Sequence, residues 1–195
     1  MRRIAWGVLL AGVAGGMVVL ADLAWTWVRF GPHVTGLAEA DPRRTAFMAR
    51  RARQGRPPVD HRWVPLDSLP RPVVCAVVAA ENARFFQHGT LDWVNQRAML
   101  SRVLRGDFAR GGSGIAQQLA RNLFLTPDRT VRRKLREYVL AYKISHGLTK
   151  ERQLELYLNM VEWGEGIWGV AAGSEHHFGR PVDALTPTET VLLAN

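Results

Sequence analysis

The chain has 195 residues, which is enough for one domain with its own core plus a short additional segment. Hydrophobic residues make up 47% of it, which excludes an intrinsically disordered protein. The 26 Lys and Arg residues against 17 Asp and Glu residues give a formal net charge of +9. This excess indicates an anionic partner, which can be nucleic acid, anionic lipid or a phosphorylated substrate. The single cysteine, Cys75, excludes a disulfide within the chain, and its apolar neighbours predict that it is buried.

The N-terminal segment predicts a membrane anchor. An uncharged run of 18 residues from Ile4 to Ala21 would form a helix about 27 Å long, close to the ~30 Å hydrocarbon core of a bilayer. Trp25 and Trp27 follow, as expected at a membrane interface. A cleaved signal peptide is the alternative, but its apolar core usually has about 7–15 residues, and no small-residue cleavage site follows. We therefore predict an anchor over residues 1–30. Its N-terminus should face the cytoplasm, because a long downstream domain translocates largely regardless of charge.

Residues 31–59 predict a basic juxtamembrane connector. The steps Gly31-Pro32 and Asp41-Pro42 interrupt it. A short basic helix over 43–53 could lie near the membrane surface, and a solvated helix face explains the same pattern.

The remaining residues, 60–195, predict a mainly α-helical domain. Helical periodicity covers four segments, which are Val73 to Phe86, Ile115 to Leu125, Val131 to Leu148 and Lys150 to Trp163. Thr149 is a predicted N-cap, and a capping box at Thr186 opens a further helix that stops after one turn at Asn195. We therefore expect the natural chain to continue. No run of alternating apolar and polar residues predicts a strand.

Glu81 is the first candidate for catalysis. It follows eight apolar residues, so we expect it at the edge of the core, where partial burial makes a carboxylate a stronger base. In a continuing helix, Phe85 and His88 would lie on the same side as Glu81. For this segment alone, an ordinary exposed Glu after a buried helix is the simpler explanation.

A glycine-rich turn precedes the helix that carries Gln118, Arg121 and Asn122. Backbone N–H groups at such a helix start favour anions, and Arg121 adds a charged donor. The Gly-Lys-Ser/Thr ending of a nucleotide-binding P-loop is missing. The segment predicts either an anion site or a plain flexible loop.

A basic cluster opens the next helical segment. Five cations lie near Glu137, namely Arg129, Arg132, Arg133, Lys134 and Arg136. Because Glu137 lies four residues after Arg133, an ion pair on the helix surface is one explanation. The departure of a pyrophosphate would use the same grouping. The apolar residues of this helix, Leu135, Tyr138, Val139 and Tyr142, predict its buried face.

Taken in order, these segments resemble the signature motifs of the family 51 peptidoglycan glycosyltransferases. The five matching stretches are residues 81–88, 111–122, 133–137, 150–159 and 163–181. The resemblance covers roughly residues 60–195. Within this family the chain is most similar to the monofunctional biosynthetic type, because its motifs begin right after a single anchor. A C-terminal transpeptidase region beyond Asn195 stays open.

The resemblance implies a lysozyme-like, mainly α fold behind an N-terminal transmembrane helix, and an inverting glycosyl transfer. Glu81 would deprotonate the 4-hydroxyl of the acceptor, lipid II, while undecaprenyl pyrophosphate leaves the growing β-1,4-linked strand. Glu137 would be the second catalytic carboxylate. The implied substrate-binding residues are Phe85, His88, Ser113, Gln118, Arg121, Asn122, Arg129, Arg133 and Lys134, with the arginines on the pyrophosphates.

The resemblance also implies a setting. The chain would be a single-pass protein of the bacterial inner membrane with its catalytic domain on the periplasmic side. Its partners would be lipid II, the growing glycan strand and membrane lipids, with other cell-wall synthases as candidates. Nucleic acid is not an expected partner, given the anchor and the lack of a recognised motif. No cofactor is required and the sequence has no dedicated metal-ligand cluster, although the family often responds to divalent cations such as Mg²⁺ or Mn²⁺.

The chain departs from the family pattern beside the catalytic positions. Asn82 stands where Asp is usual, Gly114 where Thr is usual and Ala116 where a hydroxyl residue is usual. These changes leave open a catalytically weakened homologue that binds lipid II or cell-wall synthases. A glycoside-cleaving enzyme of the lysozyme-like group is another alternative, but it would not need the arginine cluster.

Overall fold

The computed structural model describes residues 2–55, 61–93, 97 and 112–194, and it confirms a mainly α-helical protein. Its α-helices are α1 (Arg2–Gly36), α2 (Ala46–Arg53), α3 (Arg71–Asn82), α5 (Ile115–Phe124), α6 (Val131–Gly147), α7 (Lys150–Met160), α8 (Val170–Phe178) and α9 (Pro187–Leu193). The strands β1 (Glu162–Gly164) and β2 (Ile167–Trp168) pair, and short 3₁₀ turns are η1 (Leu66–Ser68), η2 (Phe85–Gln87) and η3 (Val182–Ala184).

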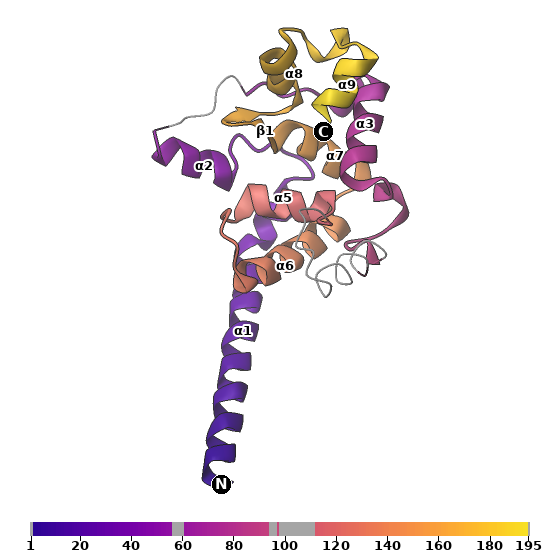
Figure 1. Ribbon diagram of the computed structural model, residues 1–195. Coiled ribbons are helices and arrows are strands. Elements are labelled where there is room, and N and C mark those ends of the chain that lie inside the picture. The colour runs from indigo at the N-terminus through magenta and orange to yellow at the C-terminus, as the bar shows by residue number, and fades with distance from the viewer. Residues whose placement is uncertain (1, 56–60, 94–96, 98–111, 195) are drawn as a thin grey trace.

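Helix α1 projects from the rest of the protein as one long rod, with the N-terminus at its far end (Figure 1). Its segment Leu9–Gly36 is long and apolar enough to cross a membrane. Side chains such as Val18 and Leu20 are more than two-thirds exposed, as expected for residues that face lipid. The helix continues through Gly31-Pro32, where the sequence suggested a break, because its C-terminal part packs against α6.

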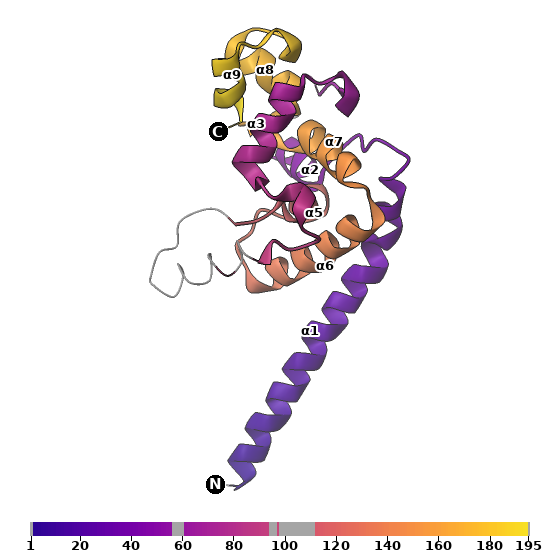
Figure 2. The same cartoon turned by 90° about the vertical axis from the view of Figure 1, so that its right-hand side faces the viewer.

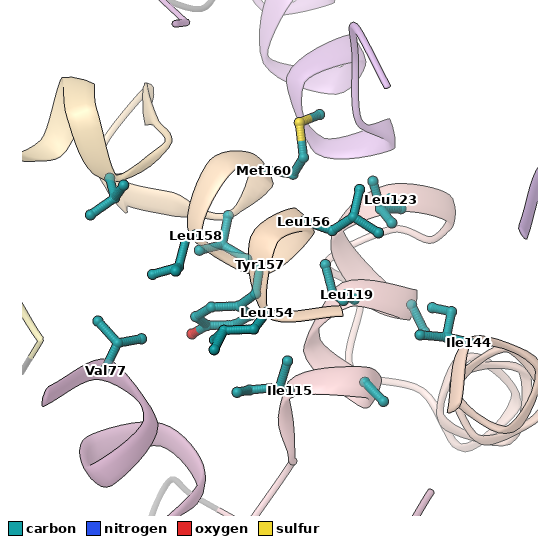
Figure 3. Close-up of a cluster of buried hydrophobic side chains, with 14 of the residues drawn as sticks. Val77, Ile115, Leu119, Leu123, Ile144, Leu154, Leu156, Tyr157, Leu158 and Met160 are labelled. Atoms are coloured by element: carbon teal, nitrogen blue, oxygen red, sulfur yellow. The ribbon is translucent and has the colours of Figure 1, made fainter. Parts of the chain in front are cut away.

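Helix α7 lies at the centre of the core. Leu154 and Leu158 are completely buried, and around them lie Val77 of α3, Leu119 of α5 and Ile144 of α6 (Figure 3). The predicted caps are confirmed. The Thr149 hydroxyl accepts a hydrogen bond from the third backbone N–H of α7, and the Thr186 capping box opens α9. Helix ends that were predicted from capping chemistry therefore agree with the structure.

Helix α6 buries a different face from the predicted one. Leu140, Ala141 and Ile144 are completely buried, whereas Tyr142 of the predicted apolar face is 48% exposed. Tyr142 instead makes a ring contact with Trp27 of α1. Periodicity identifies an apolar face, but it cannot tell whether the core or the membrane anchor covers that face.

The glycine-rich segment after α7 forms a small hairpin that the sequence did not predict. Strands β1 and β2 pair antiparallel around a turn in which Gly166 has a φ of 79°. Gly169 follows with a φ of 84°, and a Cβ there would lie 2.9 Å from the Asn159 carbonyl oxygen. Strands of two and three residues are too short to show alternation.

Helix α3 differs from its prediction in two ways. It ends at Asn82, so Phe85 and His88 lie in the turn that follows and not on the same helical side as Glu81. The prediction that Cys75 is buried is also wrong, because this residue is exposed. Within the apolar run of α3, only Val73 and Val77 are buried, since one face of the helix meets the core and the other does not.

Candidate active site

Glu81 lies near the C-terminal end of α3, on the side that faces α5. Its carboxylate accepts a 2.7 Å hydrogen bond at Oε2 from Nε2 of Gln118. The same amide nitrogen also donates to the backbone oxygen of Ser113, at 3.2 Å. Glu81 is exposed, so the expected partial burial is wrong. The structure therefore gives this carboxylate both a fixed direction and access to solvent.

Two cavities meet at Glu81. One has a volume of about 310 Å³ and is lined by Ala80, Glu81, Gly112, Ser113, Gln118 and Arg121. The other has a volume of about 190 Å³ and is lined by Val77, Glu81, Tyr157, Val161, Glu162, Trp163, Leu193 and Ala194. A base in this position can be reached from two sides, which suits a reaction that joins two molecules.

Glu137 is a buried carboxylate on α6 with two cationic partners. It accepts hydrogen bonds from Arg133 and Lys134, which lie four and three residues earlier on α6. Lys134 also donates to the Ser113 hydroxyl, at 3.0 Å, and Ser113 lines the cavity. Because a buried carboxylate needs compensating charge, this pairing fixes the directions of both cations.

Arg121 and Arg129 have different surroundings. Arg121 lines the first cavity, and its buried Nε atom has no hydrogen-bond partner among the described residues. Arg129 is exposed in the turn before α6 and forms no ion pair with any residue in the described ranges. Both guanidinium groups are thus available to an anion that enters from the cavity or from solvent.

Six of the nine predicted substrate-binding residues are not among those that line the two cavities, namely Phe85, His88, Asn122, Arg129, Arg133 and Lys134. Phe85 is buried in the core beneath the ammonium group of Lys150, which lies 4.4 Å from the ring centroid. Burial lowers the pKa of this Lys150. Asn122 is buried and donates to the backbone oxygen of Gln118. These contacts stabilise the helices that carry Glu81 and Gln118.

His88 lies in the turn after α3 and is not among the residues that line the two cavities at Glu81. Its Nε2 atom lies 3.0 Å from Oδ1 of Asn82, and its Nδ1 atom lies 2.8 Å from the backbone oxygen of Gly89. It lines an apolar groove of about 980 Å³ that includes Trp27 of α1. The structure therefore places His88 between the catalytic helix and the anchor.

Tyr157 is a site residue that the sequence reasoning missed. Its hydroxyl lies 3.3 Å from Oε1 of Gln118, and its ring lines the second cavity. Burial, together with the nearby Glu81 carboxylate, raises the pKa of Tyr157 far above its usual range. The hydroxyl therefore remains protonated and can donate. The sequence offered one indication of this role, because the Tyr157 hydroxyl is a polar group between two leucines of α7.

Asn82 and Gly114, two positions at which the chain differs from the usual family residue, are in contact in the structure. Asn82 is buried, and its Nδ2 atom has no hydrogen-bond partner among the described residues. A Cβ at Gly114 would lie 2.9 Å from that same atom. The small residue at 114 therefore makes room for the asparagine amide, which links two departures that looked independent in the sequence.

In the part of the chain that the structure describes, no group of three or more His, Cys, Asp or Glu side chains could hold a metal ion. Glu81 accepts a hydrogen bond from Gln118, whereas Glu137 is held by Arg133 and Lys134. The described residues thus do not fit a dedicated Mg²⁺ or Mn²⁺ site.

Comparison with known proteins agrees with this geometry. A family model described as transglycosylase matches residues 49–195. A biosynthetic peptidoglycan transglycosylase of Rhodospirillum centenum is 40% identical over 194 residues, covering 100% of this chain and 78% of that protein. A protein of the same name from Thiobacillus denitrificans is 39% identical over 198 residues, covering 98% of this chain and 84% of that protein. The chain therefore belongs to the transglycosylase family.

Proposed function

We propose that this chain polymerises lipid II into β-1,4-linked glycan strands and releases undecaprenyl pyrophosphate. The observation that carries the proposal is the position of Glu81, a carboxylate held by Gln118 where two cavities meet. An acceptor sugar can approach this base from one cavity and a lipid-linked donor from the other. The relatives named peptidoglycan transglycosylases support the same reaction.

In the proposed reaction, Glu81 removes the proton from the 4-hydroxyl of the acceptor GlcNAc. The hydroxyl oxygen then attacks the anomeric carbon of the donor MurNAc from the face opposite the pyrophosphate. The bond between that carbon and the pyrophosphate oxygen breaks, and the electron pair leaves with undecaprenyl pyrophosphate, so the configuration inverts. A pyrophosphate leaving group needs stabilisation of negative charge more than a proton, and preorganised cations supply it.

The cations assigned to the pyrophosphates are Arg121, Arg129 and Arg133, with Lys134 beside them. Glu137 is assigned to orient Arg133 and Lys134, since it is buried and accepts hydrogen bonds from both. This role supports the departure of the pyrophosphate leaving group, because cations that are already in place need not reorganise as negative charge develops on it.

The proposed setting is the bacterial inner membrane, with the catalytic domain on the periplasmic side. Support comes from the apolar helix α1 and from the length of the domain that follows it. The growing strand, membrane lipids and other cell-wall synthases are the proposed partners, and nucleic acid is not one of them. The proposed reaction uses no cofactor, and no step is assigned to a metal.

The experiment is to incubate the detergent-purified full chain with labelled lipid II and separate glycan strands from monomer by gel electrophoresis. We expect a ladder of strands that a muramidase digests to short fragments. Lipid II that binds the protein but remains monomeric would contradict polymerisation. That result would instead favour the weakened homologue.

A further inference from the structure

The basic cluster at the start of α6 divides into two groups that serve different partners. Arg133 and Lys134 bind Glu137, and Lys134 also donates to Ser113, which lines the cavity. Arg132 and Arg136, which lie four residues apart on another face of the helix, bind Asp22 of α1. The sequence alone shows a single basic run, but in the structure two of its five cations bind the membrane anchor.

Asp22 is held by several contacts at once. Its Oδ2 atom accepts a 2.8 Å hydrogen bond from Nε of Arg136, and its Oδ1 atom binds the terminal nitrogens of both Arg136 and Arg132. The carboxylate side chain is 11% exposed. A bidentate contact of this kind fixes distance and direction together, which a single ion pair does not.

The contact between the two helices continues beyond Asp22. The Lys143 ammonium group lies 3.7 Å from the centroid of the Trp27 ring. A Cβ at Gly31 would lie 2.9 Å from the nitrogen of the same lysine, so the glycine permits the close approach. Figure 2 shows α6 lying across the upper part of α1, with the N-terminal part of α1 extending away.

The uncharged run that ends just before Asp22 is about as long as the hydrocarbon core of a bilayer is thick, so within the longer apolar segment Leu9–Gly36 we place the membrane boundary at Asp22. A charged carboxylate at this depth raises the free energy of the folded protein unless a cation compensates it. Two arginines from the catalytic domain supply that compensation. Since α6 also carries Arg133, Lys134 and Glu137, the clamp connects the membrane boundary to the cations beside the cavity through one rigid helix.

We propose that Asp22 is a positioning residue, which locks α6 to the anchor so that Arg133 and Lys134 meet a lipid-linked pyrophosphate at a fixed height above the bilayer. This inference rests on the proposed function. The pyrophosphate of a membrane-embedded substrate is confined to the headgroup layer, so the enzyme must present its cations there. Glu81 and Gln118 lie on other helices, so loss of the clamp should affect engagement of the substrate more than the chemical step.

The test compares full-length proteins in proteoliposomes that contain lipid II. Asp22→Asn keeps the shape and removes the charge. It should raise KM about tenfold while kcat stays within about twofold, because the clamp aligns cations that bind the substrate and does not touch the reacting groups. The double variant Asp22→Arg with Arg136→Asp exchanges the charges of one pair across the same contact, and it should restore most of the KM. Asp41→Asn is the matched control, because it removes a carboxylate that pairs with Arg152 on α7 and does not touch α6. It should change neither constant.

An unchanged KM in Asp22→Asn contradicts the proposal. A fall in kcat with an unchanged KM, or a double variant that recovers nothing, indicates a purely structural role and also overturns it. If Asp22→Asn fails to accumulate, recovery of the KM in the double variant decides the question. A wild-type protein that makes no strands would contradict the proposed function itself. If the wild type makes strands and the Asp22 variants have the wild-type KM, this inference alone is contradicted.

Discussion

Gln118 connects Glu81 to Tyr157 across three helices. It donates to the carboxylate at 2.7 Å, and the Tyr157 hydroxyl lies 3.3 Å from its Oε1 atom. Because Glu81 is exposed, its direction depends on this hydrogen bond more than on packing. An exposed base that is held in place loses less conformational freedom on reaching the transition state than a freely rotating one.

Replacing Gln118 by Met keeps a similar volume and removes the donor. We expect kcat to fall roughly tenfold, the lower end for a hydrogen bond to a charged group worth ~1.5–3 kcal/mol, because solvent screens Glu81. Lipid II binding should stay the same, since the cations carry it. Steady-state kinetics and a binding assay with purified protein check this expectation. A wild-type kcat in Gln118→Met would show that Gln118 does not position the base.

Asn82 and Gly114 should be energetically coupled. A Cβ at Gly114 meets the Asn82 amide at 2.9 Å, so Gly114→Thr alone overpacks the site and should destabilise the protein by about 1–3 kcal/mol. Combining it with Asn82→Asp gives the threonine hydroxyl an acceptor. The free energy of unfolding of the double variant should therefore fall by less than the sum of the decreases in the two single variants. Chemical denaturation of all four proteins measures the coupling, and additivity within about 0.5 kcal/mol would contradict it. If the wild type is catalytically weakened, the double variant should also polymerise faster.

At the scale of single residues, the sequence selected Glu81, Glu137, Gln118 and Arg121 as candidates from residue type and motif. The structure places Glu81, Gln118 and Arg121 around one cavity and connects Glu137 to it through Lys134. It could not place Phe85, which is buried, because a motif residue can serve the core as well as the substrate. The contact of Tyr157 with the site depends on the packing of α7 against α5, which no local pattern records.

At the scale of elements, α6 has three functional faces. Leu140 and Ile144 pack into the core, and Arg132 and Arg136 hold the anchor. Arg133 and Lys134 hold Glu137, and Lys134 also reaches Ser113 of the cavity. Capping chemistry predicted where α7 and α9 begin, because it is local. The assignment of faces failed for α6, since a helix that contacts both a core and an anchor has two apolar stripes. The hairpin was missed because its strands are short.

Arg129 and Arg133 should respond differently to replacement by Ala. Arg129 is exposed without an ion pair in the described ranges, so Arg129→Ala should weaken lipid II binding about three- to tenfold at low salt and less at high salt. Its free energy of unfolding should not change. Arg133→Ala should lower both binding and stability, because it leaves Glu137 with one cation fewer. Binding measured at several salt concentrations tests this, with Arg53→Ala on α2 as an exposed control. Equal binding by Arg129→Ala and wild type at every salt concentration would remove Arg129 from the site.

At the scale of the whole molecule, α1 and the catalytic helices form a continuous structure. The anchor does not end in a loose connector. Instead α1 runs to Gly36, and α2 is tied to the hairpin by ion pairs from Arg51 to Glu162 and Glu165. The sequence predicted the anchor and the helical domain from composition and periodicity. It did not predict how they join, because that contact is made between residues about 110 positions apart.

The orientation in the membrane has a direct test. A phosphatase reporter that folds only in the periplasm, fused after residue 195, should be active, because the N-terminal arginines and the long downstream domain favour a cytoplasmic N-terminus. A galactosidase reporter at the same position should be inactive. The reverse pattern would place the catalytic domain in the cytoplasm and contradict the proposed topology.

The replacement Glu81→Gln tests the central claim most directly. It keeps the shape of the side chain and removes the base, while the cations that bind lipid II stay in place. Polymerisation of labelled lipid II should fall by a factor on the order of 10²–10⁴, with little change in binding. Glu175→Gln on α8 makes the same chemical change at an exposed position outside both cavities and should keep the wild-type rate. A Glu81→Gln protein that polymerises at the wild-type rate would contradict the account.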